Sequence, residues 1–150
     1  MNKDTFFMQK ALDQANKAFD EGEVPIGAVI TLDGEIVAEA HNTPISSNDP
    51  SCHAEVNVIR RAAKILNNYR LANTSLYVTL EPCMMCCGLL IHSRVENLIF
   101  AAPDPKSGAV ISNGKFLNSD FINHEVKFSH GLLEADASEI LKRFFKEKRL

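Results

Sequence analysis

The sequence contains no apolar run long enough to cross a membrane and no cysteine outside residues 52–87. A membrane-spanning helix needs about 20 consecutive apolar residues, so no such helix and no membrane partner are expected. The first residues, MNKDTFFMQKAL, also lack the apolar run of a secretory signal and contain Asp4. Four cysteines crowded into one segment make a poor disulfide framework and indicate metal or redox chemistry. The sequence therefore predicts a cytoplasmic protein.

The chain also lacks the strong positive charge of a typical nucleic-acid-binding protein, because its net charge is −3 and its pI about 5.9. The charge is uneven, however. The last nine residues, KRFFKEKRL, carry a net +4, which leaves −7 for the rest of the chain. This basic end can face phosphate groups, with Phe144 and Phe145 between its cations. It can equally be a solvated helix terminus whose lysines suit the helix dipole.

Length and patterning favour one globular domain over residues 1–150, with alternating helices and strands. A helical period runs from Asp4 and ends at Gly22. The β-rich runs PIGAVITL and EIVAEA flank Asp33-Gly34, a strong hairpin signal. Asp49-Pro50 predicts the cap and first turn of a helix reaching about Leu66. Further strands are expected at 75–80, 97–102 and 125–129, and further helices at about 83–92 and 134–148. Helices between strands predict an α/β fold, a three-layer α/β/α sandwich with a central mixed five-stranded sheet.

Two short stretches carry the residues for a metal site, SCHAEV at 51–56 and PCMMCC at 82–87. Cys83 and Cys86 are three apart at a predicted helix start, so both thiols face one point, and a helix N-terminus favours their thiolates. His53, at the opening of the preceding helix, completes a His-Cys-Cys set. A catalytic zinc uses three such ligands and leaves the fourth position to water. The spacing predicts one Zn²⁺ per chain with Glu55 as general base, provided that the site lies off the first turn of the helix.

Two other interpretations of the cysteines remain. A redox Cys-x-x-Cys needs a thioredoxin-like context and leaves His53 and Glu55 without a role. A structural zinc site uses a fourth protein ligand, which Cys52 or Cys87 can supply. Because Cys87 is rotated about 100° around the helix from its neighbour, and Cys52 points away from the site, packing in the protein interior is favoured for both.

His-Ala-Glu at 53–55 followed by Pro-Cys-x-x-Cys at 82–86 resembles the signature of zinc nucleobase deaminases, within the cytidine/deoxycytidylate deaminase superfamily. The similarity to TadA-type tRNA-specific adenosine deaminases covers nearly the whole chain. It is carried by EVPIGAVI (23–30), AHN (40–42), NYRL (68–71), LYVTLEPCMMC (76–86), HSR (92–94), DPKSGA (104–109) and FFKEKR near the end. The resemblance implies a cytidine deaminase-like fold and hydrolytic conversion of adenosine to inosine at the wobble position of a tRNA anticodon. It also implies a homodimer that binds the anticodon loop near the subunit boundary.

The resemblance also implies residue roles. His53, Cys83 and Cys86 match the zinc ligands, and Glu55 matches the proton shuttle. The positions that match the family's substrate contacts are Pro25 and Ile26 in the apolar pocket wall, Asn42 at the target base or its ribose, Ala54 through its backbone amide, and Asp104, Lys106, Asn123 and His124 at the flanking nucleotides. The outer residues have structural interpretations as well, since Asp104-Pro105 is also a good turn and Asn123 suits a loop cap.

Several positions depart from the family's usual pattern. The chain has Cys87 where alanine is usual, Glu125 where an arginine typically follows the Asn-His pair, and AVISNGK where a Gly-Ser pair usually follows the loop. Pro103 and Thr43 occupy positions that are often basic. A lost basic side chain removes a phosphate contact, and such contacts supply most nucleic-acid affinity. The departures therefore concern RNA recognition and leave the chemistry intact.

Three functions compete on these grounds, and tRNA adenosine deamination is favoured. The second is deamination of a free nucleobase, nucleoside or nucleotide, such as guanine, cytosine or deoxycytidylate. Cytidine deaminases usually have a cysteine where His53 stands, and guanine deaminases lack the DPKSGA loop and the basic closing helix. The third is a non-enzymatic module stabilised by zinc.

Overall fold

The computed structural model describes residues 2–148, so Arg149 of the predicted basic end lies outside the described residues. The helices are α1 (Lys3–Asp20), α2 (Pro44–Ser47), α3 (Ala54–Leu66), α4 (Met84–His92) and α5 (Glu134–Lys148), with a 3-10 helix, η1, at Phe116–Asn118. The strands are β1 (Gly27–Leu32), β2 (Glu35–His41), β3 (Thr74–Leu80), β4 (Asn97–Ala102) and β5 (Lys127–His130). Within residues 2–148, no helix has the length and apolar character needed to cross a membrane.

A mixed five-stranded sheet in the order β2-β1-β3-β4-β5 forms the middle layer. β1 pairs antiparallel with β2 and β3, whereas β3, β4 and β5 run parallel. β1 and β2 form the predicted hairpin. Its turn residues Asp33 and Gly34 both have positive φ angles, 52° and 79°. A type I′ turn requires this conformation at both positions, which is why the Asp-Gly pair specifies the hairpin.

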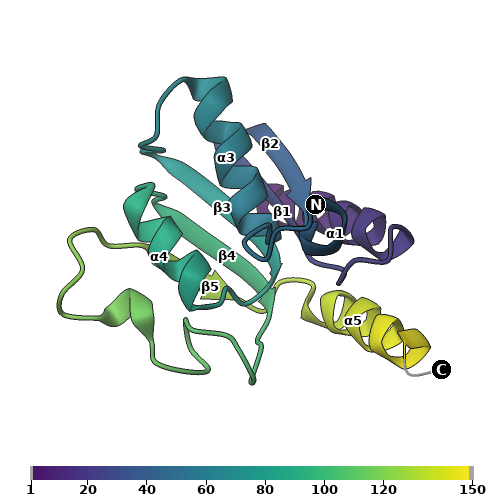
Figure 1. The fold of residues 1–150 in the computed structure, drawn as a ribbon. Coiled ribbons are helices and arrows are strands. Elements are labelled where there is room, and N and C mark those ends of the chain that lie inside the picture. The colour runs from purple at the N-terminus through teal and green to yellow at the C-terminus, as the bar shows by residue number, and fades with distance from the viewer. Residues whose placement is uncertain (1, 149–150) are drawn as a thin grey trace.

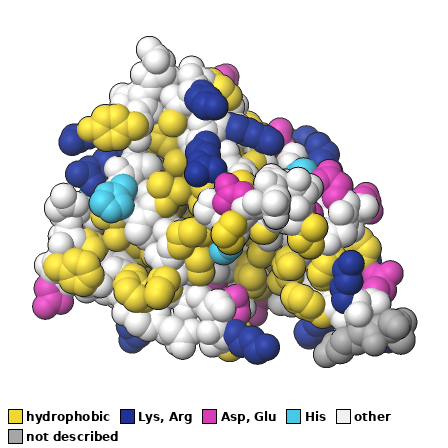
Figure 2. All heavy atoms as spheres, in the orientation of Figure 1, with side chains coloured by type: hydrophobic (Ala, Val, Ile, Leu, Met, Phe, Trp, Pro, Cys, Tyr) yellow, Lys and Arg dark blue, Asp and Glu magenta, His cyan; other side chains and the backbone are white. Residues whose placement is uncertain are grey.

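Helices cover both faces of the sheet, which confirms the α/β/α sandwich (Figure 1). On one face, Val58 of α3 and Leu90 of α4 belong to the larger buried apolar cluster. On the other face, Met8 of α1 and Ala137 of α5 belong to a second cluster. Burying a side chain the size of Leu or Met contributes roughly 1.5–3 kcal/mol, so both layers hold the sheet in place. In the same orientation, Figure 2 shows hydrophobic side chains gathered across the middle of the face that carries α3 and α4.

The start of α3 differs from the sequence-based expectation. The helix begins at Ala54, and His53 is its N-cap residue in an extended conformation. Asp49 does not cap the helix, because its carboxylate accepts hydrogen bonds from the backbone N–H and the hydroxyl of Ser51 at 2.9 and 2.7 Å. This local turn, which includes Pro50, satisfies the side chain before the helix starts. The unpredicted helix α2 precedes it.

Two other boundaries are also shifted. α4 begins at Met84 rather than at Cys83, which is its N-cap residue and is extended like His53. β5 begins at Lys127 rather than at residue 125, because its register on β4 starts where Asn97 faces Lys127. The first shift matters for function, since a cap residue projects its side chain off the end of a helix instead of along its flank.

The strand directions bring four connecting segments to one edge of the sheet. β3 and β4 end at this edge, β2 ends there as well, and the antiparallel β1 begins there. Residues 24–26, 41–43, 81–83 and 103–106 therefore lie close together although they are distant in sequence. In α/β sheets, ligands bind beyond the carboxyl ends of the parallel strands. The topology thus places all four segments where a site is expected.

Candidate active site

His53, Cys83 and Cys86 meet at the N-terminal ends of α3 and α4. Nδ1 of His53 lies 3.6 Å from Sγ of Cys83 and 3.7 Å from Sγ of Cys86. The three ligand atoms all lie within 4.8 Å of one another. Tetrahedral zinc, with bonds of about 2.0–2.1 Å to nitrogen and 2.3 Å to sulfur, separates such atoms by about 3.6 Å. The donor set and its spacing therefore fit zinc.

The surroundings of the two thiols favour metal binding. Cys83 precedes the first turn of α4 and Cys86 lies within that turn, so both are near unpaired helix N–H groups that stabilise thiolates. A hydrogen bond with the Cys86 thiol lowers the pKa of Cys83 to about 3, and His53 acts in the same direction. The shared contact with Cys83, together with burial, raises the pKa of the Cys86 thiol. These contacts favour the thiolate form of Cys83, which is the form that binds zinc.

Glu55 lies beside this triad, in the first turn of α3, and its side chain is only 4% exposed. Burial raises the pKa of its carboxyl to about 7, against smaller opposing contributions from its own backbone N–H and from His53. A carboxyl that titrates near neutral pH can both take up and release a proton, which general acid–base catalysis requires. Because His53 is a cap residue, it and Glu55 can line the same cavity although they are two residues apart.

Asn42 follows β2, and its side-chain oxygen accepts a hydrogen bond from the Ala54 N–H at 3.1 Å. This contact orients the Asn42 amide and leaves its NH₂ group as the donor for a ligand. The segment is held by Asn57 of α3, which donates to the His41 carbonyl at 2.8 Å and to the Thr43 hydroxyl at 2.9 Å. Because the Ala54 N–H already donates to Asn42, the substrate contact expected from this backbone amide stays a prediction.

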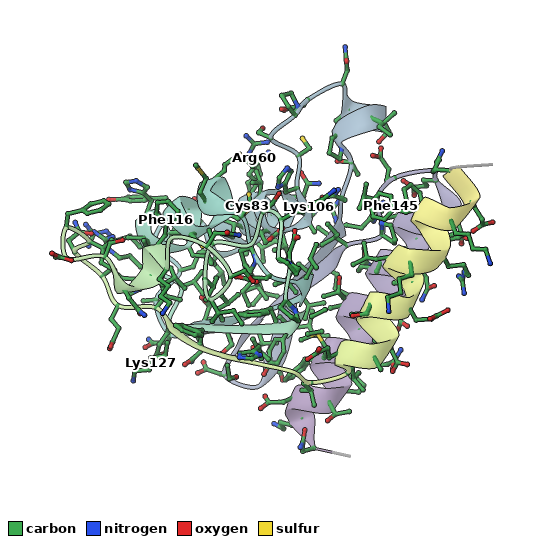
Figure 3. All side chains as sticks on the ribbon, turned by 90° about the horizontal axis from the view of Figure 1, so that it is seen from below. Arg60, Cys83, Lys106, Phe116, Lys127 and Phe145 are labelled. Carbon is green, nitrogen blue, oxygen red and sulfur yellow. The ribbon has the colours of Figure 1, made fainter. Side chains whose placement is uncertain are left out.

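A cavity of about 830 Å³ opens beside His53, Glu55 and Cys83. This size is typical of sites for nucleotides and other small ligands. Its apolar wall is formed by Val24, Ile26, Leu80, Ala102, Leu141 and Phe145, and its polar lining includes Asn42, Asp104, Lys106, Lys142 and Lys148. Figure 3 shows Cys83 and Lys106 near the centre of the molecule and Phe145 on the side of α5 that faces them. The cavity therefore joins a possible metal centre to an aromatic and cationic rim.

The structure gathers some of the predicted substrate contacts but not all. Ile26, Asn42, Asp104 and Lys106 line the cavity, whereas Pro25 is buried outside its lining. The turn interpretation of Asp104 is confirmed as well, because its Oδ1 accepts hydrogen bonds from the N–H groups of Lys106 and Ser107 at 3.1 and 3.3 Å. The residue closes a turn and faces the cavity at once.

Asn123 and His124 lie elsewhere and are not among the described residues that line this cavity. The Asn123 side chain accepts a hydrogen bond from Arg94 at 3.4 Å, and a ring nitrogen of His124 donates to the Val95 carbonyl at 2.8 Å. Both contacts anchor the loop before β5 to the end of α4. A role of these two residues at flanking nucleotides therefore stays a prediction.

The two remaining cysteines have the predicted buried positions. Cys87 is fully buried in the larger apolar cluster, and Cys52 is 7% exposed. Neither belongs to the triad of possible metal ligands found among the described residues. This arrangement favours a three-ligand site over a structural site with four cysteine and histidine ligands.

Sequence reasoning missed Glu81, which directly follows β3 and is 3% exposed. Burial opposes its charge, but hydrogen bonds from Ser112 and from the backbone of the facing loop hold the pKa of its carboxyl below the usual range. The one sequence feature that could have drawn attention to Glu81 is its position between an apolar strand and Pro82-Cys83. That position does not indicate which groups donate hydrogen bonds to the carboxylate.

Comparisons with known proteins agree with this geometry. The family model described as MafB19-like deaminase matches residues 1–149. A tRNA-specific adenosine deaminase from Aquifex aeolicus (strain VF5) is 46% identical over 144 residues, covering 96% of this chain and 95% of its relative. A tRNA-specific adenosine deaminase from Bacillus subtilis (strain 168) is 43% identical over 149 residues, covering 99% of this chain and 92% of its relative.

A solved structure from a study of A-to-I editing by tRNA:A34 deaminases at the wobble position of transfer RNA superimposes with a TM-score of 0.90. It is 43% identical, and the match covers 91% of this chain and 99% of that chain. A guanine deaminase from Nitrosomonas europaea matches with a TM-score of 0.76 at 20% identity, which shows the shared fold alone. With a full-length family match and relatives above 40% identity, this chain belongs to the MafB19-like deaminase family and, within it, to the tRNA-specific adenosine deaminases.

Proposed function

We propose that residues 1–150 form one zinc-dependent hydrolytic deaminase domain that converts adenosine to inosine at the wobble position of a tRNA anticodon. The observation that carries this proposal is that His53, Cys83 and Cys86 lie at zinc spacing, while His53, Cys83 and the buried Glu55 line one cavity. The family membership of the chain and its likeness to a tRNA:A34 deaminase support the choice of substrate.

His53, Cys83 and Cys86 would hold the metal, which would act as a Lewis acid and make the attacking water more acidic. Glu55 takes a proton from the attacking water and delivers it to the ring nitrogen beside the amine-bearing carbon. It later transfers a proton to the departing amine, so water and adenosine become inosine and ammonia. The NH₂ group of Asn42 and the apolar side chain of Ile26 orient the base inside the cavity.

The rim of the cavity suits a single-stranded RNA loop. Lys106, Lys142 and Lys148 line it together with Phe145, which is 46% exposed. Lysines neutralise phosphates, and an exposed aromatic ring stacks on bases of any sequence. The target base has to leave its stack to enter the cavity, and unstacking costs least in a loop. These features favour an anticodon loop over a free base.

The decisive assay uses purified protein with an anticodon stem-loop that has adenosine at the wobble position. Inosine is scored beside a panel of guanine, cytosine, adenosine and deoxycytidylate. We expect inosine in the stem-loop and no product from the panel. Turnover of a panel compound without inosine in RNA would contradict the proposal and favour the second candidate function.

Replacing Lys106 and Lys148 together by alanine should weaken stem-loop binding. The slope of log affinity against log salt concentration should also fall by about two, because each lost phosphate contact reduces this slope by about one. Fluorescence anisotropy over a range of salt concentrations measures both quantities. The charge-matched control replaces Lys64 and Lys127, at the C-terminal end of α3 and the start of β5, outside the cavity lining. An unchanged salt slope would place the phosphates elsewhere.

We also propose that the chain acts as a cytoplasmic homodimer. Met84 and Met85, at the start of α4, are 60% and 38% exposed beside the metal ligands. Both residues belong to α4, and hydrophobic side chains gather over the face that carries α4 (Figure 2). Exposed apolar patches of this kind often mark protein interfaces. Light scattering at tens of micromolar should give about twice the 16.6 kDa chain mass. A molar mass equal to that of one chain under these conditions would contradict the proposed homodimer.

A further inference from the structure

We propose that Glu81 is a positioning residue whose buried carboxylate fixes the loop of residues 104–112, so that residues 104–107 form a wall of the cavity, and thereby sets the affinity for the nucleotides that flank the target adenosine. The inference rests on the proposed function, because it assigns a part of the same cavity to RNA. Glu81 has no place in the chemistry described above. Its hydrogen bonds and its position in the chain carry the argument.

Both carboxylate oxygens of Glu81 are fully used. Oε1 accepts hydrogen bonds from the Asp104 N–H at 2.9 Å and from the Ser112 hydroxyl at 2.6 Å. Oε2 accepts from the N–H groups of Val110, Ile111 and Ser112 at 3.0, 2.8 and 3.0 Å. Hydrogen bonds to an ionised acceptor are roughly twice as strong as those between neutral groups. A single side chain thus satisfies four backbone N–H groups that otherwise have no strand or helix to pair with.

These donors come from both ends of one loop. Asp104 lies at its start, and residues 110–112 lie at its end, so the carboxylate draws the two ends together. Pro105, Lys106 and Ser107 lie between them and line the cavity. The loop has internal bonds that preserve its shape, such as those from the Asn113 side chain to the Pro105 and Gly108 carbonyls. The bonds to Glu81 fix where that shape stands relative to the sheet.

The loop also approaches Glu81 closely. A Cβ atom on Gly108 would lie 2.3 Å from the Cδ and Oε1 atoms of Glu81, which is far inside van der Waals contact. Next to this point, the Ala109 N–H donates to the Pro82 carbonyl at 2.9 Å. Only a residue without a side chain at position 108 lets the loop reach the carboxylate. The Gly108 site therefore offers a way to disturb the contact while keeping Glu81.

Glu81 also connects the loop to the reaction centre. It directly follows β3 and stands two residues before the metal ligand Cys83. The chain segment that positions Cys83 therefore positions the wall that carries Lys106. A fixed wall lowers the entropy lost when flanking nucleotides bind, because the loop is already in its bound arrangement. Loosening it should weaken binding of the flanking nucleotides and leave the chemistry of the bound base unchanged.

The test compares Glu81→Gln, Gly108→Ala and Ser112→Ala with the wild-type protein. Glu81→Gln places an NH₂ group against backbone donors, and we expect KM for the stem-loop to rise about tenfold or more. Gly108→Ala should act in the same direction with the carboxylate retained. Ser112→Ala removes one hydroxyl contact of five and should raise KM least. In all three variants, kcat and zinc content should stay near the wild-type values.

A second substrate separates a positioning role from general loss of stability. In this RNA the nucleotides that flank the adenosine are abasic. The abasic change should raise KM strongly for the wild-type protein and little for Glu81→Gln, because two changes that remove the same interaction do not add. Met8→Ala, a buried change in the α1 layer, is the destabilised control and should retain the full abasic penalty.

The outcomes are distinct. A raised KM at constant kcat, with a reduced abasic penalty, supports the role of Glu81. Wild-type activity on the stem-loop with unchanged KM in Glu81→Gln and Gly108→Ala would overturn it, as would an abasic penalty equal to that of the wild type. A wild-type protein that forms no inosine in the stem-loop contradicts the proposed function itself.

Discussion

Replacing Glu55 by alanine should lower turnover of the anticodon stem-loop by at least about 100-fold, the lower end of the range for general acid–base catalysis. Glu55 lines the cavity beside the triad, and burial raises the pKa of its carboxyl to about 7. Without it, the proton of the attacking water has no nearby acceptor, and the ring nitrogen has no donor. Zinc content and stem-loop binding should remain, since the side chain is not one of the three ligands. Single-turnover formation of inosine at saturating enzyme measures the chemical step directly.

Two further variants sharpen this test. Glu55→Gln keeps the size of the side chain but cannot carry a proton between two sites, so its loss should match that of Glu55→Ala. Glu35→Ala, an exposed glutamate at the start of β2, is the matched control and should retain wild-type turnover. Near-native turnover by Glu55→Ala on the stem-loop and on the free-base panel would leave the deaminase mechanism without its proton carrier.

Local sequence signals predicted those parts of the fold that local forces determine. Asp33-Gly34 specifies the hairpin because both of its residues tolerate positive φ. The period of Phe7, Met8 and Ala11 specifies α1 because one helical face has to be buried. The His53, Cys83 and Cys86 cluster was predictable for a related reason, since zinc chemistry limits the ligands of a proposed site to a few residue types at short spacings.

Other features depend on choices that a local pattern leaves open. Asp49-Pro50 suits a helix start, but Asp49 bonds Ser51 within its own turn, and α3 begins at Ala54 instead. The bonds of Glu81 join residues 23 to 31 positions apart, and nothing near Glu81 in the sequence indicates its partners. Long-range partners of a buried polar group follow from the whole fold, which is why this residue was missed.

The position of α5 shows the same limit. Its apolar period predicts a buried face, and Ala137, Ile140 and Phe144 are buried as expected. The period does not say what the edges of that face meet. In the structure, Leu141 and Phe145 on one edge complete the wall of the cavity. The helix was predicted to have both an apolar face, which includes Leu141 and Phe145, and a basic end, and part of that apolar face lines the site.

Replacing His53 by alanine should remove the metal and abolish turnover, because two thiolates alone leave the catalytic set one ligand short. Elemental analysis of protein purified without chelator should give one zinc per wild-type chain and well under half an equivalent for His53→Ala. Removing the metal also removes the activated water, so the loss of turnover should be at least as large as that for Glu55→Ala. Zinc content separates the two variants, since Glu55→Ala should keep its metal.

The chain supplies matched controls for the thiol ligands. Cys83→Ser and Cys86→Ser should lose zinc, because both sulfur atoms belong to the triad. Cys52→Ala and Cys87→Ala should retain it, because these thiols are buried outside the triad. Zinc loss in Cys87→Ala with retention in Cys86→Ser would show that the second sulfur ligand is Cys87 and that its assignment to Cys86 is wrong. Less than half an equivalent of zinc in the wild-type protein would contradict the metal site as a whole. Loss of zinc from the three triad variants alone would tie the metal to the ends of α3 and α4, where the sheet topology brings Glu55 and the cavity beside it.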